Sequence, residues 1–143
     1  MTDSHLRHRS AAAGYRRIRN ESLANQSTPQ ELILLVYESL IDRLIKCQGS
    51  LAQGEDPAFS RENLKCMQLI QYGLRDSLSF DLGGEVAVGL DRTYSTWILA
   101  LEFLHSSRSQ ERLASLLADV REVRDAWKVA FGGAAPAPDQ VSP

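Results

Sequence analysis

The chain has little of what enzymes and metalloproteins usually depend on. Its 143 residues include two cysteines, Cys47 and Cys66, without the C-x-x-C spacing of a zinc site or a redox motif. We expect both to be buried, reduced thiols, because free cysteine behaves as a small apolar side chain. The sequence has no phosphate loop, dinucleotide fingerprint or serine nucleophile elbow. It therefore gives little support to an enzyme, and we predict no catalytic residue and no cofactor.

Histidine is scarce as well, with three in the chain. Glu102 and His105 have the Glu-x-x-His spacing of di-iron bundles, but such a site needs two of these units and two further inward-pointing glutamates. The other two histidines, His5 and His8, both lie in the polar N-terminal stretch. We therefore predict no metal site. We expect His105 to lie near a helix C-terminus, where partial positive charge is favoured.

Positive and negative residues are nearly balanced in number, and the sequence has no long apolar run. Sixteen Lys and Arg against eighteen Asp and Glu give a net charge of −2, so we predict neither nucleic-acid binding nor membrane insertion. No apolar run approaches the roughly 18 residues of a membrane span, and the N-terminus lacks the apolar core of a signal peptide. We expect a cytoplasmic protein. Residues 1–27 are basic, and we interpret them as a largely flexible arm, although such an arm could also steer an acidic partner.

Helical periodicity is what the sequence does contain. Thr28 and Glu31 form a capping box around Pro29, because the threonine can accept from a first-turn N–H while the glutamate reaches back. Asp56 is expected to cap the second helix, with Pro57 at its first position. The expected helices cover approximately residues 28–51, 56–79, 85–105 and 110–131.

Short polar or glycine-containing segments separate the expected helices. Asp81 and the glycine pair at 83–84 predict a turn before the third helix, because glycine reaches positive φ without a Cβ clash. A second glycine pair follows the fourth helix, and the tail beyond it has three prolines in residues 134–143. We predict an all-α fold. It is an antiparallel four-helix bundle over residues 28–131, with a mobile N-terminal arm and a disordered tail over 132–143.

Each expected helix has one apolar stripe at helical spacing, which we assign to the core. In the second helix the stripe is Phe59, Cys66, Met67, Ile70, Leu74 and Leu78, and in the fourth it is Leu113, Leu116, Leu117, Val120, Val123, Trp127 and Phe131. The first helix has Leu32, Val36, Leu40, Leu44, Cys47 and Leu51 in one sector, and the third has Leu90, Tyr94, Trp97, Leu101 and Leu104.

The first and third helices also have a second apolar stripe each. In the first helix it is Leu34, Ile41 and Ile45, and in the third it is Val88, Leu99 and Phe103. A bundle helix buries one face, so these stripes need a further partner. The arm could fold back through Tyr15, Ile18 and Leu23, another protein could bind in a groove, or two copies of the chain could pair.

Several short motifs resemble the flagellar secretion chaperone family, FliS, over roughly residues 15–130. They are Tyr15-x-x-Ile18, Pro29-x-Glu31-Leu32-Ile33 with Tyr37, Asp81-x-Gly83-Gly84-Glu85-Val86-Ala87, Leu90 with Tyr94, and Arg121-x-x-x-Asp125-Ala126-Trp127. The resemblance implies a cytosolic bundle, without a cofactor, that binds the disordered C-terminal segment of flagellin, its client. Binding would prevent premature polymerisation, and the chaperone would deliver the client to the flagellar export gate.

The resemblance also implies that Tyr15 and Ile18 belong to a mobile segment that covers part of the client groove. Together with the second stripes, this gives a set of predicted client-binding residues on the arm and on two helices: Tyr15, Ile18, Leu34, Ile41, Ile45, Val88, Leu99 and Phe103. The alternative is a structural or regulatory helical protein that uses the same stripes to form a homodimer. A stable dimer without client would favour the alternative, and a 1:1 complex with flagellin would favour the chaperone.

Overall fold

A computed structural model describes residues 28–78 and 80–132, and these residues contain helices without a strand. The elements are α2 (Pro29–Ala52), α3 (Asp56–Gln68), the π-helix η1 (Leu69–Arg75), α4 (Phe80–Ser107) and α5 (Gln110–Gly132). The predicted all-α fold is confirmed. The predicted arm, with Tyr15 and Ile18, and nearly all of the predicted tail lie outside the described residues.

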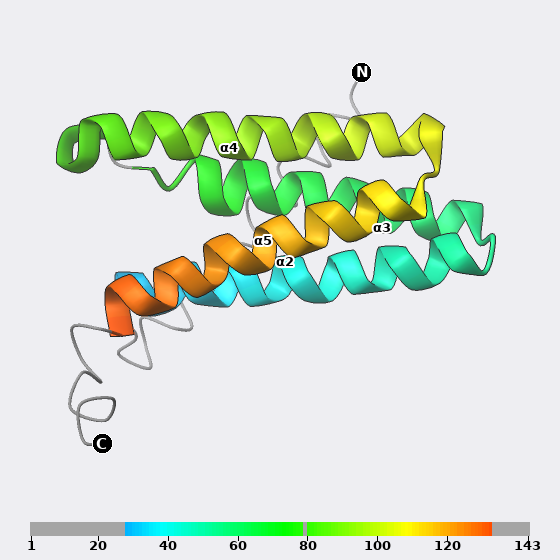
Figure 1. The fold of residues 1–143 in the computed structure, drawn as a ribbon, viewed down its shortest axis with the longest axis horizontal. Coiled ribbons are helices and arrows are strands. Elements are labelled where there is room, and N and C mark those ends of the chain that lie inside the picture. The colour runs from blue at the N-terminus through cyan, green and yellow to red at the C-terminus, as the bar shows by residue number, and fades with distance from the viewer. Residues whose placement is uncertain (1–27, 79, 133–143) are drawn as a thin grey trace, which may run out of the picture.

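Successive helices run in alternate directions (Figure 1). α4 lies along one long edge of the bundle and α2 along the other, with α5 and the α3–η1 segment between them. α5 starts close to the end of α4 and diverges from α4 toward its own C-terminus, where it lies beside the start of α2. α4 and α5 are therefore closest at the turn that joins them and farthest apart at the C-terminus of α5 (Figure 1).

Local capping explains where α2 begins. Glu31 N–H donates to Thr28 Oγ1 over 3.1 Å and Thr28 N–H donates to Glu31 Oε1 over 2.7 Å, so the predicted capping box is confirmed. α3 begins one residue earlier than predicted, with Glu55 rather than Asp56 as its N-cap. Pro57 tolerates this shift because N–H groups in the first turn have no intrahelical partner.

Two further boundaries differ from the prediction. α4 begins at Phe80, so the glycine pair at 83–84 lies inside its first turns and the predicted turn at this position is wrong. Each glycine costs a helix only about 1 kcal/mol relative to alanine, which packing elsewhere on a long helix can offset. The second helix does not continue to residue 79 as an α-helix, because Leu69–Arg75 widens to π geometry and Asp76 N–H donates to Gln71 O over 3.0 Å.

The predicted core stripes are confirmed, since their members are buried or packed against the buried cluster, and Phe131 stacks on Trp127 with 4.8 Å between ring centroids. Ile41 is a correction: we predicted it in an outward stripe, but it is 5% exposed and belongs to the core. The cause is the number of neighbours of α2, which packs on α3, η1 and α5 and so buries a wider sector than one stripe.

A two-residue turn joins α4 to α5, as the polar segment at 106–109 predicts. Arg108 has a φ of 54°, in the left-handed region that side chains other than glycine rarely adopt. Its side chain is well anchored, because Nη1 donates to Asp56 Oδ1 over 2.8 Å and the guanidinium lies 4.8 Å from the centroid of the Phe59 ring. These contacts fix the turn against the start of α3.

Candidate functional site

Three apolar side chains form an exposed row on α4, which we call the α4 stripe. Val88 is 48% exposed, Leu99 63% and Phe103 51%. Tyr94 and Trp97, on the other side of the same helix, are buried in the core. The sequence pattern therefore placed both faces of this helix correctly. All three members of the α4 stripe are thus exposed in the described structure, although the guanidinium of Arg112 lies 4.7 Å from the centroid of the Phe103 ring.

The corresponding row on α2 is smaller than predicted. Ile45 is exposed, Leu34 is half-buried, and Ile41 is in the core. Because α2 and α4 lie along opposite edges of the bundle, the residues on these two helices form two separate surfaces (Figure 1). A single partner could contact both only by wrapping around the bundle.

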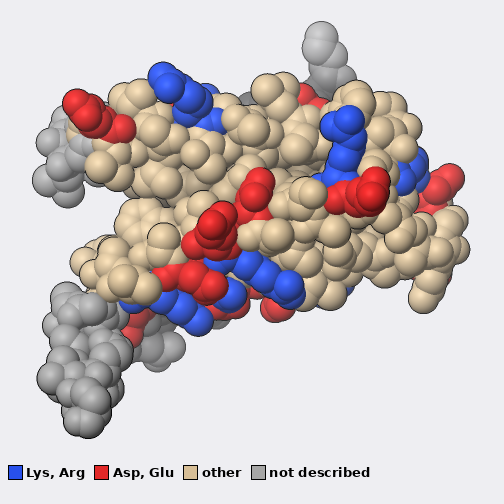
Figure 2. All heavy atoms as spheres, in the orientation of Figure 1, with Lys and Arg blue, Asp and Glu red and all other residues tan. Residues whose placement is uncertain are grey.

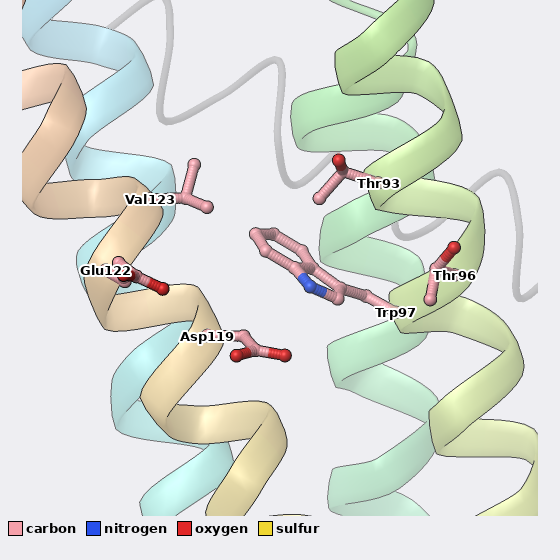
Figure 3. A pocket seen from close by; sticks show the side chains of 6 residues that line it. All are labelled: Thr93, Thr96, Trp97, Asp119, Glu122 and Val123. Atoms are coloured by element: carbon pink, nitrogen blue, oxygen red, sulfur yellow. The ribbon is translucent and has the colours of Figure 1, made fainter.

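A pocket of about 240 Å³ opens between α4 and α5, where the two helices diverge. Its lining includes polar residues from α4, a tryptophan, and acidic and apolar residues from α5, namely Thr93, Thr96, Trp97, Asp119, Glu122 and Val123 (Figure 3). Thr96 lies three residues before Leu99, on the adjacent face of α4. The pocket and the α4 stripe are therefore neighbours. No local sequence pattern predicts this pocket, because it depends on how far two consecutive helices diverge after the turn that joins them.

Trp97 forms the floor of this pocket. Its ring is held by Tyr94, with 5.5 Å between ring centroids, and by Tyr37 in an edge-to-face contact at 6.4 Å. The side chain is 3% exposed, yet its indole N–H donates no hydrogen bond to any described residue. Figure 3 shows the six-membered end of the indole toward Val123 and the nitrogen on the edge facing Asp119.

A hydrogen-bonded group of aromatic residues supports the floor from below. The hydroxyls of Tyr37 and Tyr94 are 2.7 Å apart, and Trp127 Nε1 donates to Tyr37 Oη over 3.0 Å. Burial raises the pKa of both tyrosines above the ordinary value, so the two hydroxyls stay neutral in the folded protein. This group links α2, α4 and α5 and gives the pocket a rigid base.

The rim of the pocket is acidic. Figure 2 shows acidic atoms along the part of α5 that faces α4. Asp119 and Glu122 are exposed and have no ion-pair partner among the described residues. By contrast, Arg124 pairs with Glu38 at 2.9 Å and with Asp125 at 2.6 Å. The two rim carboxylates thus leave an uncompensated negative charge beside an apolar floor.

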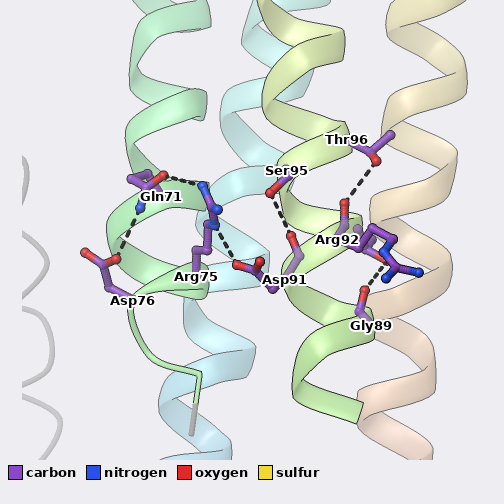
Figure 4. Close-up of polar contacts among 9 residues, drawn as sticks. Gln71, Arg75, Asp76, Gly89, Asp91, Arg92, Ser95 and Thr96 are labelled. Atoms are coloured by element: carbon purple, nitrogen blue, oxygen red, sulfur yellow. Dashed lines mark hydrogen bonds and ion pairs between the residues drawn. The ribbon is translucent and has the colours of Figure 1, made fainter. Parts of the chain in front are cut away.

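One ion pair joins α4 to η1, and further hydrogen bonds hold polar side chains within α4 (Figure 4). Arg75 Nε, at the end of η1, donates to Asp91 Oδ1 over 2.6 Å. The Thr93 and Thr96 hydroxyls donate to backbone carbonyls four residues earlier in α4, over 3.1 and 2.9 Å. Their oxygen lone pairs remain able to accept a hydrogen bond at the pocket.

Metal-ligating side chains do not cluster in the described part of the chain. No group of three or more His, Cys, Asp or Glu side chains in it could hold a metal ion. Cys47 and Cys66 are free and buried as predicted, with their sulfurs 3.9 Å apart, and the Cys47 thiol and burial raise the pKa of Cys66. No described helix is long and apolar enough to cross a membrane.

The fold and the site thus define an all-α bundle with an exposed apolar stripe on α4 and a pocket between α4 and α5. The model of the family described as "Flagellar protein FliS" matches residues 11–133, and the chain belongs to this family. FliS is a family of chaperones and not of enzymes, so membership supports a role as a flagellar export chaperone.

Curated relatives cover most of the chain. The flagellar secretion chaperone FliS of Vibrio cholerae is 24% identical over 83% of this chain and 87% of its own length. FliSB of Pseudomonas aeruginosa is 28% identical over 79% of this chain and 89% of its own length. FliS of Salmonella typhimurium is 26% identical over 83% of this chain and 88% of its own length.

Proposed function

We propose that this protein binds the disordered C-terminal segment of flagellin in the cytoplasm, keeps it from polymerising, and delivers it to the flagellar export apparatus. The family match supports the chaperone role. The observation that supports the client surface is the α4 stripe, because Val88, Leu99 and Phe103 are exposed on a helix whose opposite face is fully packed.

The chemistry of this surface suits a helix that forms on binding. Apolar side chains of an amphipathic helix recur every three or four residues and can pack along Leu99 and Phe103. Each fully buried side chain of this size favours association by about 1.5–3 kcal/mol. Ordering a disordered segment costs about 2–5 kcal/mol. Association costs about 4–15 kcal/mol more through lost translational and rotational freedom, so the client must contact more than the α4 stripe. Ile45 and Leu34 on α2, together with Tyr15 and Ile18 of the arm, are the further residues that we assign to it.

The test is binding of purified flagellin fragments from the same bacterium. We expect the C-terminal segment alone to bind as a 1:1 complex and to gain helix by circular dichroism. Flagellin that lacks this segment should fail to bind. Equal binding of the truncated flagellin would overturn the proposal, and a stable homodimer that does not bind either fragment would favour the dimer interpretation instead.

A further inference from the structure

The pocket between α4 and α5 combines two properties that the α4 stripe lacks. Its floor is apolar, formed by Trp97 and Val123, while its rim carries the carboxylates of Asp119 and Glu122. We propose that this pocket binds one lysine or arginine side chain of the client segment and so selects which client, and in which register, is held. This inference rests on the proposed function.

Size favours a single side chain over a small-molecule ligand. Pockets for drug-sized ligands and cofactors occupy about 300–1,000 Å³, and this pocket measures about 240 Å³. Lysine and arginine have long apolar stems below a charged head, and they bury the stem along apolar surface while the head stays near water. The stem would lie over Trp97 and Val123, and the head would reach the rim.

Charge favours a cation at the rim. Asp119 and Glu122 are three residues apart on α5, so both carboxylates project from the same face of the helix. Neither has an ion-pair partner among the described residues, whereas Asp125, a few residues later, pairs with Arg124. A cationic head beside two carboxylates gains charge-assisted hydrogen bonds.

The indole N–H of Trp97 favours a peptide over a free cation as the ligand, because it offers a donor beside the acidic rim. Trp97 is buried, and its nitrogen faces the pocket without an acceptor in the described structure (Figure 3). A peptide supplies both groups that the pocket requires, a backbone carbonyl to accept from the indole and a cationic side chain for the rim. Thr96 borders both the pocket and the α4 stripe, so a helix packed on Leu99 brings a neighbouring side chain to this position.

The experiment compares two charge-matched variants of the full-length protein. Asp119→Asn with Glu122→Gln removes the rim charges. Glu102→Gln with Glu111→Gln is the control, because it removes the same net charge from exposed positions of α4 and α5 outside the pocket. The probe is the flagellin C-terminal fragment, measured by titration calorimetry. We expect the rim variant to bind about three- to tenfold more weakly than the control at low salt, with the difference shrinking as salt rises.

A second probe identifies the cationic side chain. In single variants of the fragment, each lysine and arginine is changed to glutamine in turn. One of these changes should weaken binding of the fragment to the wild-type protein. The same change should not weaken its binding to the rim variant any further. The indole ¹⁵N resonance of Trp97 can be assigned by comparison with the Trp127→Phe variant, which lacks the other tryptophan signal. This resonance should shift when the unmodified fragment binds, and it should shift less when the fragment carries the Lys or Arg to Gln change that weakens binding.

The possible failures are distinguishable. If the wild-type protein does not bind the fragment, the proposed function fails and the pocket proposal falls with it. If the wild type binds but the rim variant binds as tightly as the control, only the pocket proposal fails. The arm of this chain also carries Arg16, Arg17 and Arg19. If changing these three to glutamine shifts the Trp97 indole resonance in the free protein, the pocket holds the arm and the proposal of a client side chain is overturned.

Discussion

Nearby residues on α4 have opposite structural roles: Leu99 and Phe103 are exposed, whereas Trp97 is buried. Leu99 and Phe103 are exposed, so changing both to aspartate should abolish flagellin binding and cost about 1 kcal/mol of folding stability or less. Trp97 is buried among Tyr37 and Tyr94, so Trp97→Ala should cost about 3–5 kcal/mol through the cavity that it leaves. Circular-dichroism melts and a pull-down with the flagellin fragment measure both effects.

A matched control separates the α4 stripe from general surface charge. Leu35 and Val129 are also exposed apolar residues, but they lie on α2 and α5. Changing both to aspartate adds the same charge and should leave flagellin binding close to wild type. Loss of binding in this control would contradict our assignment of the client to the α4 stripe. Unfolding of the Leu99 and Phe103 double variant would contradict our assignment of the two faces of α4.

The tyrosine pair beneath the pocket should be strongly coupled. Tyr37→Phe removes the acceptor for Trp127 and leaves the buried Tyr94 hydroxyl without its partner, which should cost about 1–3 kcal/mol. Tyr94→Phe should behave similarly. The double variant should lose clearly less folding stability than the sum of the losses in the two single variants. The reason is that removing the second hydroxyl leaves no tyrosine hydroxyl unpaired. Chemical denaturation of the four proteins gives the coupling energy, and simple additivity would contradict the shared hydrogen bond.

At the scale of the element, α4 contains replaceable glycines. Gly84 and Gly89 are helical, and a Cβ added at either would meet no atom within 4 Å. Alanine at each position should therefore stabilise the protein by about 0.5–1 kcal/mol through helix propensity. Gly54, in the α2–α3 turn, has a φ of 69° and is the contrasting control, because alanine there should destabilise. Thermal melts should show higher melting temperatures for the Gly84 and Gly89 variants than for wild type, and a lower one for the Gly54 variant. A different order would contradict the helical assignment of the first turns of α4.

Much of each element could be predicted from the sequence because its signals are local. The capping box of α2 and the core stripes depend on residues three or four positions apart. The burial of the polar residue Asn63 could not be predicted from such local signals. Asn63 is 1% exposed, and its Nδ2 donates to Leu101 O over 3.0 Å. Its partner lies on α4, 38 residues away in the sequence, so no local pattern could predict this contact.

The candidate site was predictable only in part for the same reason. The exposure of Leu99 and Phe103 follows from the periodicity of one helix. The burial of Ile41 does not, because it depends on how many neighbours α2 has. The pocket floored by Trp97 depends on the divergence of α4 from α5, and the π geometry of Leu69–Arg75 has no local signal comparable to a cap.

For the whole molecule, the buried tyrosine pair predicts loss of stability in alkali. Burial raises the pKa of Tyr37 and Tyr94 in the folded state above the ordinary value of 10.0. Below about pH 10 both hydroxyls are neutral in either state, so their full contribution to stability is present. Above it, the unfolded chain releases these protons while the folded protein retains them. Stability should therefore fall as pH rises, by about 1.4 kcal/mol per tyrosine for each pH unit.

Denaturation at a series of pH values from about 8 to 11 tests this prediction. The double variant Tyr37→Phe with Tyr94→Phe should show a shallower decline above pH 10 than the wild type, because it no longer contains the two groups with raised pKa. An equally steep decline in the double variant would show that other groups cause the alkaline unfolding.

The start of α2 lies close to the end of α5. Side-chain contacts between these two helices, rather than the order of the helices along the chain, therefore hold this part of the bundle together. Glu38 meets Arg124, and Tyr37 meets Trp127, across this junction. A flexible linker could join residue 132 back to residue 28, and the chain could be opened at the exposed Gly54 turn. Such a circular permutant would begin with α3 and end with α2. It would present the α4 stripe unchanged, with its new termini at the opposite end of the bundle.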